Sequence, residues 1–167
     1  MNKNLYLLLF LLFQSLAIYA GEKVNPSDLD LYLCIGQSNM AGRANLTPEI
    51  MDTLQNVYLL NDKGHFEPAS NPLNRYSTIR KNLSMQRLGP SYAFAKEIER
   101  KTKHPVGLVV NARGGSSINA WLKGSKNGYY EKALSRIRIA LKQGGHLKAI
   151  LWHQGEADCS NPEEYKQ

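Results

Sequence analysis

The sequence contains few cysteines and histidines, and this scarcity argues against most metal chemistry. Only two cysteines occur, which is too few thiols for a zinc cluster. The histidines are His65, His104, His146 and His153. Their positions show no spacing typical of metal ligands. We therefore expect neither a structural metal nor a cofactor.

Long hydrophobic runs are absent after residue 20, so no later segment is expected to cross a membrane. The first twenty residues, MNKNLYLLLFLLFQSLAIYA, combine a basic start at Lys3 with an apolar stretch and a final Ala20. This pattern predicts a secretory signal peptide over residues 1–20. A membrane anchor is the alternative, but the apolar run over residues 5–13 is too short to span a bilayer. We expect a secreted or periplasmic protein with no membrane partner after removal of the signal.

The two cysteines are Cys34, in an apolar run, and Cys159, in a polar stretch. Export would permit a disulfide between them, since secreted proteins fold under oxidising conditions. Their spacing alone does not pair them, and we expect two unpaired thiols, with a disulfide as the alternative.

Acidic residues are fewer than basic ones, 14 against 21, which gives a formal charge of +7. The basic residues are scattered over helical patterns and a loop, and no aromatic-rich basic motif accompanies them. Such a distribution favours a solvated basic surface over a nucleic-acid partner. The sequence leaves the oligomeric state open.

Residues 21–167 are enough for one core of ordinary size, so we expect a single domain. Short apolar runs predict strands over residues 29–35, 57–60, 106–110 and 149–152. Apolar residues at helical spacing predict helices over 91–102 and 129–143. This alternation indicates an α/β fold with a parallel sheet covered on both faces. The long polar stretch 61–89 reads as an irregular connection.

Polar, glycine-containing segments follow three of the predicted strands. They are GQSN (36–39), NARGGSS (111–117) and HQGEAD (153–158). Ligands of parallel sheets bind beyond the carboxyl ends of the strands, which is where these three segments would meet. The sequence therefore predicts a functional site formed jointly by the three segments.

Each segment offers one chemical group and one ordinary explanation. Ser38 is a candidate nucleophile if it precedes a helix that opens at Asn39, although a serine there is commonly an N-cap. The glycines of NARGGSS would let the backbone approach a ligand, or simply form a turn. Gln154 offers an N–H₂ group for an oxyanion, or a structural hydrogen bond.

GQSNMAG, NARGGSSINAW and WHQGEAD together resemble the SGNH-hydrolase superfamily, and within it the sialate O-acetylesterase and acetylxylan esterase group of carbohydrate esterases. The resemblance covers residues 29 to about 165. It implies a flavodoxin-like three-layer α/β/α fold and hydrolysis of acetyl esters on sugars through an acyl-serine intermediate. It also implies Ser38 as nucleophile, the N–H groups of Ser38 and Gly115 as oxyanion donors, and Gln154 in the place of an asparagine donor. Gly114 is the alternative to Gly115.

The sequence departs from this family in its catalytic base. Related enzymes supply the base from an Asp-x-x-His motif after the last strand, and no such motif follows WHQGEAD here. The motif at Asp62–His65 lies in the wrong place along the chain, and His153 is adjacent to the presumed donor Gln154. We interpret the chain as C-terminally truncated, without the final strand and the base-bearing segment, and expect it to be inactive as a fragment.

The leading hypothesis is a carbohydrate O-acetylesterase, with an acetylated carbohydrate as its substrate. Two alternatives remain: a non-catalytic carbohydrate-binding module on the same scaffold, and an acetyltransferase. The sequence does not identify the sugar.

Overall fold

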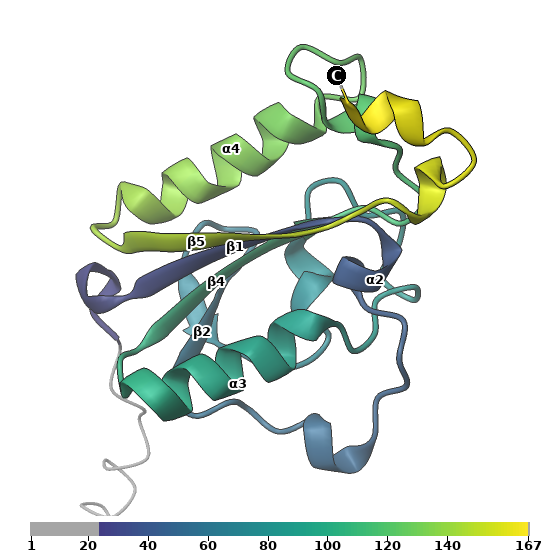
Figure 1. The fold of residues 1–167 in the computed structure, drawn as a ribbon. Coiled ribbons are helices and arrows are strands. Elements are labelled where there is room, and N and C mark those ends of the chain that lie inside the picture. Colours follow the sequence, from purple (N-terminus) through teal and green to yellow (C-terminus); the bar gives the residue numbers. More distant parts are fainter. Residues whose placement is uncertain (1–23, 167) are drawn as a thin grey trace, which may run out of the picture.

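The protein consists of a five-stranded sheet with helices on both faces (Figure 1). The computed structural model describes residues 24–166, so the predicted signal peptide lies outside the described residues. The strands are β1 (Asp30–Gly36), β2 (Val57–Leu60), β3 (Phe66–Pro68), β4 (Val106–Ala112) and β5 (His146–His153). The α-helices are α2 (Ser38–Ala41), α3 (Pro90–Thr102) and α4 (Tyr129–Leu141). Short 3-10 helices are η1 (Pro26–Asp28), η2 (Pro48–Ile50), η3 (Leu73–Tyr76), η4 (Ile118–Trp121), η5 (Glu156–Asp158) and η6 (Pro162–Lys166).

The strands lie in the order β3-β2-β4-β1-β5. β1 runs parallel to β4 and β5, and β2 runs parallel to β4, which confirms the predicted parallel sheet. α3 and α4 cover opposite faces, so the predicted three-layer α/β/α class is also confirmed (Figure 1). In flavodoxin-like sheets the first strand lies between the second and third, whereas here β1 lies between the third and fourth parallel strands. Alternation of elements does not specify this order.

The core is divided between the two faces of the sheet because successive strand residues point in opposite directions. Tyr32 and Cys34 of β1 belong to the apolar cluster under α3, whereas Leu31 and Leu33 pack with α4. All seven residues of β4 are buried. The central strands therefore need apolar residues on both faces, which explains why they read as continuous apolar runs.

The stretch 61–89 contains more structure than the sequence indicated. β3 pairs antiparallel with β2 in this stretch, and η3 follows it. β5 also begins three residues earlier than predicted and forms one edge of the sheet, where most of its residues are exposed.

None of the helices in residues 24–166 is long and apolar enough to cross a membrane.

Candidate active site

The three predicted segments meet at one edge of the sheet. Gly36, the last residue of β1, is paired with Ala112 on β4 and with His153 on β5. The polar segments that follow these strands therefore begin side by side, with the serine-bearing segment in the middle. This juxtaposition is the arrangement that the sequence predicted.

Gly36 allows β1 and β5 to approach closely at this edge. A Cβ atom at residue 36 would lie 2.0 Å from the carbonyl oxygen of His153, and the residue has a φ of +135°. Any side chain would push against backbone, so glycine is required here. The next amide, that of Gln37, donates to the same His153 oxygen at 2.9 Å.

Ser38 is half-buried and is the first residue of α2. The N-cap position belongs to Gln37, whose side chain makes no capping hydrogen bond, so Ser38 does not have the N-cap role that was its alternative explanation. Within residues 24–166, the Ser38 hydroxyl takes part in no hydrogen bond. As the first helical residue, Ser38 also has an N–H group without a carbonyl partner one turn earlier. Its hydroxyl and amide are both available to a ligand.

The glycine pair of the second segment lies beside the serine. A Cβ atom built on Gly114 would lie 3.7 Å from the Cβ of Ser38 and 2.4 Å from the Nη2 atom of Arg43. Gly115 is exposed, has a φ of +70°, and would meet nothing within 4 Å. Among the described hydrogen bonds, neither glycine amide has an acceptor, so the choice of Gly115 over Gly114 as donor remains a prediction.

Gln154 lies at the same edge, but its side chain already has partners. Its Nε2 donates to the Ser116 carbonyl at 2.9 Å, to Gln37 Oε1 at 3.2 Å and to the Asp158 carboxylate. The hydroxyl of Tyr165 donates to its Oε1. An amide has two N–H hydrogens, so an oxyanion would have to replace one of these acceptors. These bonds correspond to the structural hydrogen bonding that was the alternative explanation for Gln154. Its role as an oxyanion donor remains a prediction.

Two buried residues that the sequence did not single out hold the three segments together. Gln37 is 3% exposed, and its Oε1 also accepts from the amides of Gly155 and Ala157, at 3.4 and 3.2 Å. Asp158 is 5% exposed and accepts from the Ile118 amide at 2.9 Å. Both residues stand inside the quoted motifs, but only the fold shows that they are buried hydrogen-bond hubs.

A second group of polar side chains surrounds Asn39, the neighbour of Ser38. Asn39 donates to Glu156, and Glu156 also lies 3.6 Å from the Nε2 atom of His153. His153 and Glu156 are both largely exposed. His153 therefore faces Glu156, and no described contact joins its ring to Ser38.

The remaining histidines lie on other parts of the fold. The Asp62–His65 motif forms the turn between β2 and β3. Gln143, just after α4, donates to the Gly64 carbonyl, and Arg136 of α4 donates to the carbonyl of Asn61, which precedes the motif. His104 precedes β4, and His146 is the first residue of β5. Both therefore lie at the amino ends of their strands, whereas Ser38 lies at the carboxyl-end edge of the sheet. No hydrogen bond described for residues 24–166 joins a histidine to the serine.

Both cysteines are free, as expected. Cys34 is fully buried under α3, and burial raises the pKa of its thiol to about 11. Cys159 is exposed on the loop after η5. The neutral Cys34 thiol acts as a small apolar core residue.

Comparison with known proteins shows the family of the chain. The family model described as a carbohydrate esterase, sialic acid-specific acetylesterase, matches residues 28–167. The chain belongs to this carbohydrate esterase family. A probable carbohydrate esterase of Arabidopsis thaliana is 32% identical over 146 residues, which cover 77% of this chain and 54% of the relative.

The chain is also similar to solved structures. A structure of an Arabidopsis thaliana protein superposes with a TM-score of 0.68 at 29% identity, over 77% of this chain and 58% of that one. A carbohydrate acetylesterase from Xanthomonas citri gives a TM-score of 0.46 at 22% identity, over 77% of this chain and 33% of that one. The chain thus spans about half the length of the Arabidopsis relatives.

Proposed function

We propose that this carbohydrate esterase removes acetyl groups from acetylated sugars, with Ser38 as the nucleophile. The observation that carries the proposal is the position of Ser38, with an unbonded hydroxyl beside the glycine pair, at the edge where the three segments meet. Serine chemistry requires a free hydroxyl and nearby N–H groups for the charge that develops on the carbonyl oxygen.

In this mechanism a base takes the Ser38 proton while the hydroxyl oxygen attacks the acetyl carbonyl. The oxygen of the tetrahedral intermediate accepts hydrogen bonds from the amides of Ser38 and Gly115, with Gln154 as a further donor. The base then returns the proton to the sugar oxygen, which leaves as an alcohol, and water hydrolyses the acetyl-serine. Acetate and a free sugar hydroxyl are the products.

The proposal concerns the full-length protein, because no described hydrogen bond joins a histidine to Ser38 as its base. The family resemblance assigns that role to an Asp-x-x-His segment, which follows WHQGEAD in related enzymes. Glu156 and Asp158 contact Asn39 and Gln154 instead, and we give them no chemical step.

Export forms part of the same proposal. Residues 1–20 have the pattern of a cleaved signal, which would bring the enzyme to acetylated sugars outside the cytoplasm. Sialate and xylan esters both present a small acetyl group to these donors.

Acetate release from a panel of acetylated sugars tests the proposal, with the full-length wild-type protein compared with Ser38→Ala. We expect the variant to lose about a thousandfold or more in rate, because the nucleophile itself is removed. Ser160→Ala, on an exposed loop, is the matched control and should retain the wild-type rate. Equal rates for Ser38→Ala and wild type would refute the assignment, and sugar binding without acetate release would favour the binding module.

A further inference from the structure

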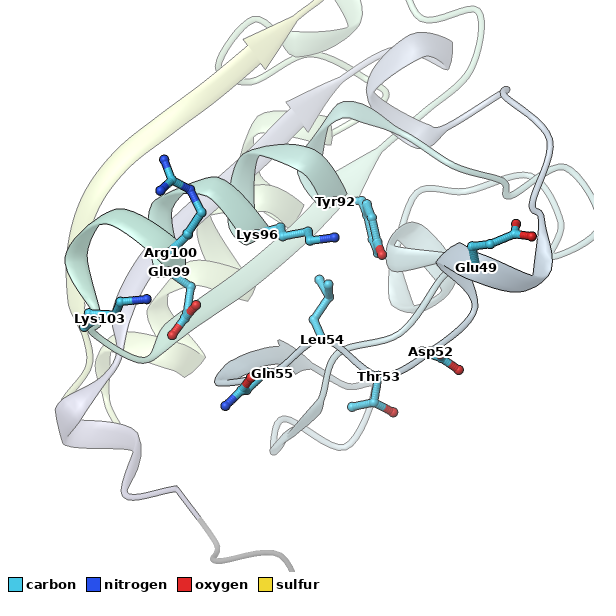
Figure 2. A pocket seen from close by; sticks show the side chains of 10 residues that line it. All are labelled: Glu49, Asp52, Thr53, Leu54, Gln55, Tyr92, Lys96, Glu99, Arg100 and Lys103. Carbon is cyan, nitrogen blue, oxygen red and sulfur yellow. The ribbon is translucent and has the colours of Figure 1, made fainter.

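Two cavities follow one side of α3 and meet at Tyr92. The first has a volume of about 370 Å³ and includes Asn39, the residue after Ser38. The second has a volume of about 440 Å³ and continues to Lys103, beyond the end of the helix (Figure 2). α3 has 13 residues, so this side of the helix is about 20 Å long.

Asn39, the sequence neighbour of the proposed nucleophile, lines the first cavity. Asn39 and Arg43 supply its polar groups, and its other walls are mostly apolar, including Leu88 and Pro90. Arg43 is held in place because its Nη1 donates to the carbonyls of Gly42 and Met85, at 2.6 and 2.8 Å. An apolar surface with a few fixed donors is the usual composition of a ligand pocket.

The second cavity presents polar groups on two opposite walls. Lys96 extends from α3 toward Tyr92, and Asp52 and Gln55 lie on the segment that faces the helix (Figure 2). In the described part of the chain these three side chains form no hydrogen bond or ion pair. Leu54 lies between the walls. The structure thus holds free donors and acceptors around an apolar patch.

The mixture of charges in this cavity indicates the class of ligand. Its basic side chains are Lys96, Arg100 and Lys103, and its acidic ones are Glu49, Asp52 and Glu99. Because the cavity has as many basic as acidic side chains, it favours neither an anionic nor a cationic ligand. Hydroxyl groups, which both donate and accept, can pair with either sign.

We propose that the two cavities form one extended groove for a neutral acetylated oligosaccharide or polysaccharide. The acetylated sugar lies at Ser38, and the adjoining sugars of the same chain lie along α3, past Tyr92 to Lys96. This inference rests on the proposed esterase function and defines its substrate as a sugar chain rather than a single sugar.

The experiment measures kcat/KM of the full-length protein on acetylated xylose and on acetylated xylo-oligosaccharides of increasing length. We expect kcat/KM to rise by about tenfold from the single sugar to the tetrasaccharide, the increase that one or two additional hydrogen bonds would give. The double variant Gln55→Ala/Lys96→Ala should lose most of this increase. Lys132→Ala, an exposed lysine on α4 across the sheet, is the control and should retain the wild-type dependence.

Three results would overturn the groove. The first is a wild-type kcat/KM that does not rise with chain length, including acetate release from acetylated monosaccharides only. The second is a double variant with an unchanged length dependence. The third is a double variant that loses the same factor on every substrate. Absence of acetate release from every sugar would instead contradict the esterase function itself.

Discussion

Single residues at the strand-end edge determine how the three segments are held. Gln37 and Ser38 are adjacent in the sequence, but Gln37 is buried and its Oε1 accepts three hydrogen bonds, while the Ser38 hydroxyl takes part in no described hydrogen bond. The backbone thus places a structural hub and a candidate nucleophile side by side. Rigid support of this kind is what a catalytic group needs, because small displacements of a reacting atom are costly in rate.

Replacement of Gln37 by leucine tests this support. The change would leave the amides of Gly155 and Ala157 without their acceptor and would remove one of the three acceptors of Gln154 Nε2. An unsatisfied buried donor costs about 1–3 kcal/mol. We expect a lower free energy of unfolding, measured with urea on the full-length protein, and a fall in kcat. Gln37→Glu retains an acceptor oxygen and should restore part of both. Equal losses in the two variants would contradict the role of the acceptor oxygen at this position.

At the scale of secondary structure, periodicity predicted the elements that form the layers. β1 and β4 are buried on both faces and therefore consist of continuous apolar residues, which a sequence pattern reveals directly. The ends of α3 and α4 were predicted to within two residues, since Gly89-Pro90 precedes one helix and Gly144-Gly145 follows the other. The shared edge of the three segments followed from the parallel arrangement.

Features that depend on tertiary contacts were not predictable in this way. A basic residue on an amphipathic helix is expected to face solvent, but Arg136 is 4% exposed and donates to the carbonyls of Leu60 and Asn61. Its charge suggested solvent, and only the fold shows that the end of β2 offers two acceptors there. The bonds of Gln154 are likewise invisible in the sequence, because their partners lie on two other segments.

β3 and η3 are a third example of structure fixed by tertiary contacts, and they suggest a pH experiment. Glu67 of β3 accepts from Arg75 Nη2 at 2.8 Å, from Asn61 at 3.1 Å and from Tyr76 at 2.9 Å. Burial raises the pKa of Glu67, but the hydrogen bonds from Arg75, Asn61 and Tyr76 outweigh it, so the pKa lies below the ordinary value of 4.5. The ionised carboxylate therefore stabilises the folded state.

We expect Glu67→Gln to lower the free energy of unfolding at neutral pH. A depressed folded-state pKa stabilises the protein above the unfolded-state value, and this stabilisation is lost as the pH falls from 4.5 through the folded-state pKa. The difference between wild type and variant should therefore shrink as the pH is lowered from about 7 to about 3. Urea unfolding at several pH values measures it. A difference that stays constant over this range would contradict the role of the charge.

At the scale of the whole molecule, the outer edge of β5 is open in the described residues. Leu147, Ile150 and Trp152 are 40%, 57% and 40% exposed, and with α4 they line an apolar cavity of about 340 Å³. Open apolar edge strands are prone to pairing with other chains. The edge strand β5 is thus more exposed than the opposite edge of the sheet, where β3 pairs with β2.

The same distribution of residues leads to a prediction about turnover. A protein consisting of residues 21–167 contains Ser38 and both glycines, but no described hydrogen bond joins one of its histidines to the serine hydroxyl, and the His153 ring faces Glu156. Loss of the base in a serine triad costs on the order of a millionfold in rate. We therefore expect no hydrolysis of p-nitrophenyl acetate that depends on Ser38 in this protein, once circular dichroism has shown that it is folded, and clear hydrolysis by the full-length protein. Activity of residues 21–167 that disappears in Ser38→Ala would contradict this expectation. Its further loss in His65→Ala or in His153→Ala would then identify which histidine reaches the serine in solution.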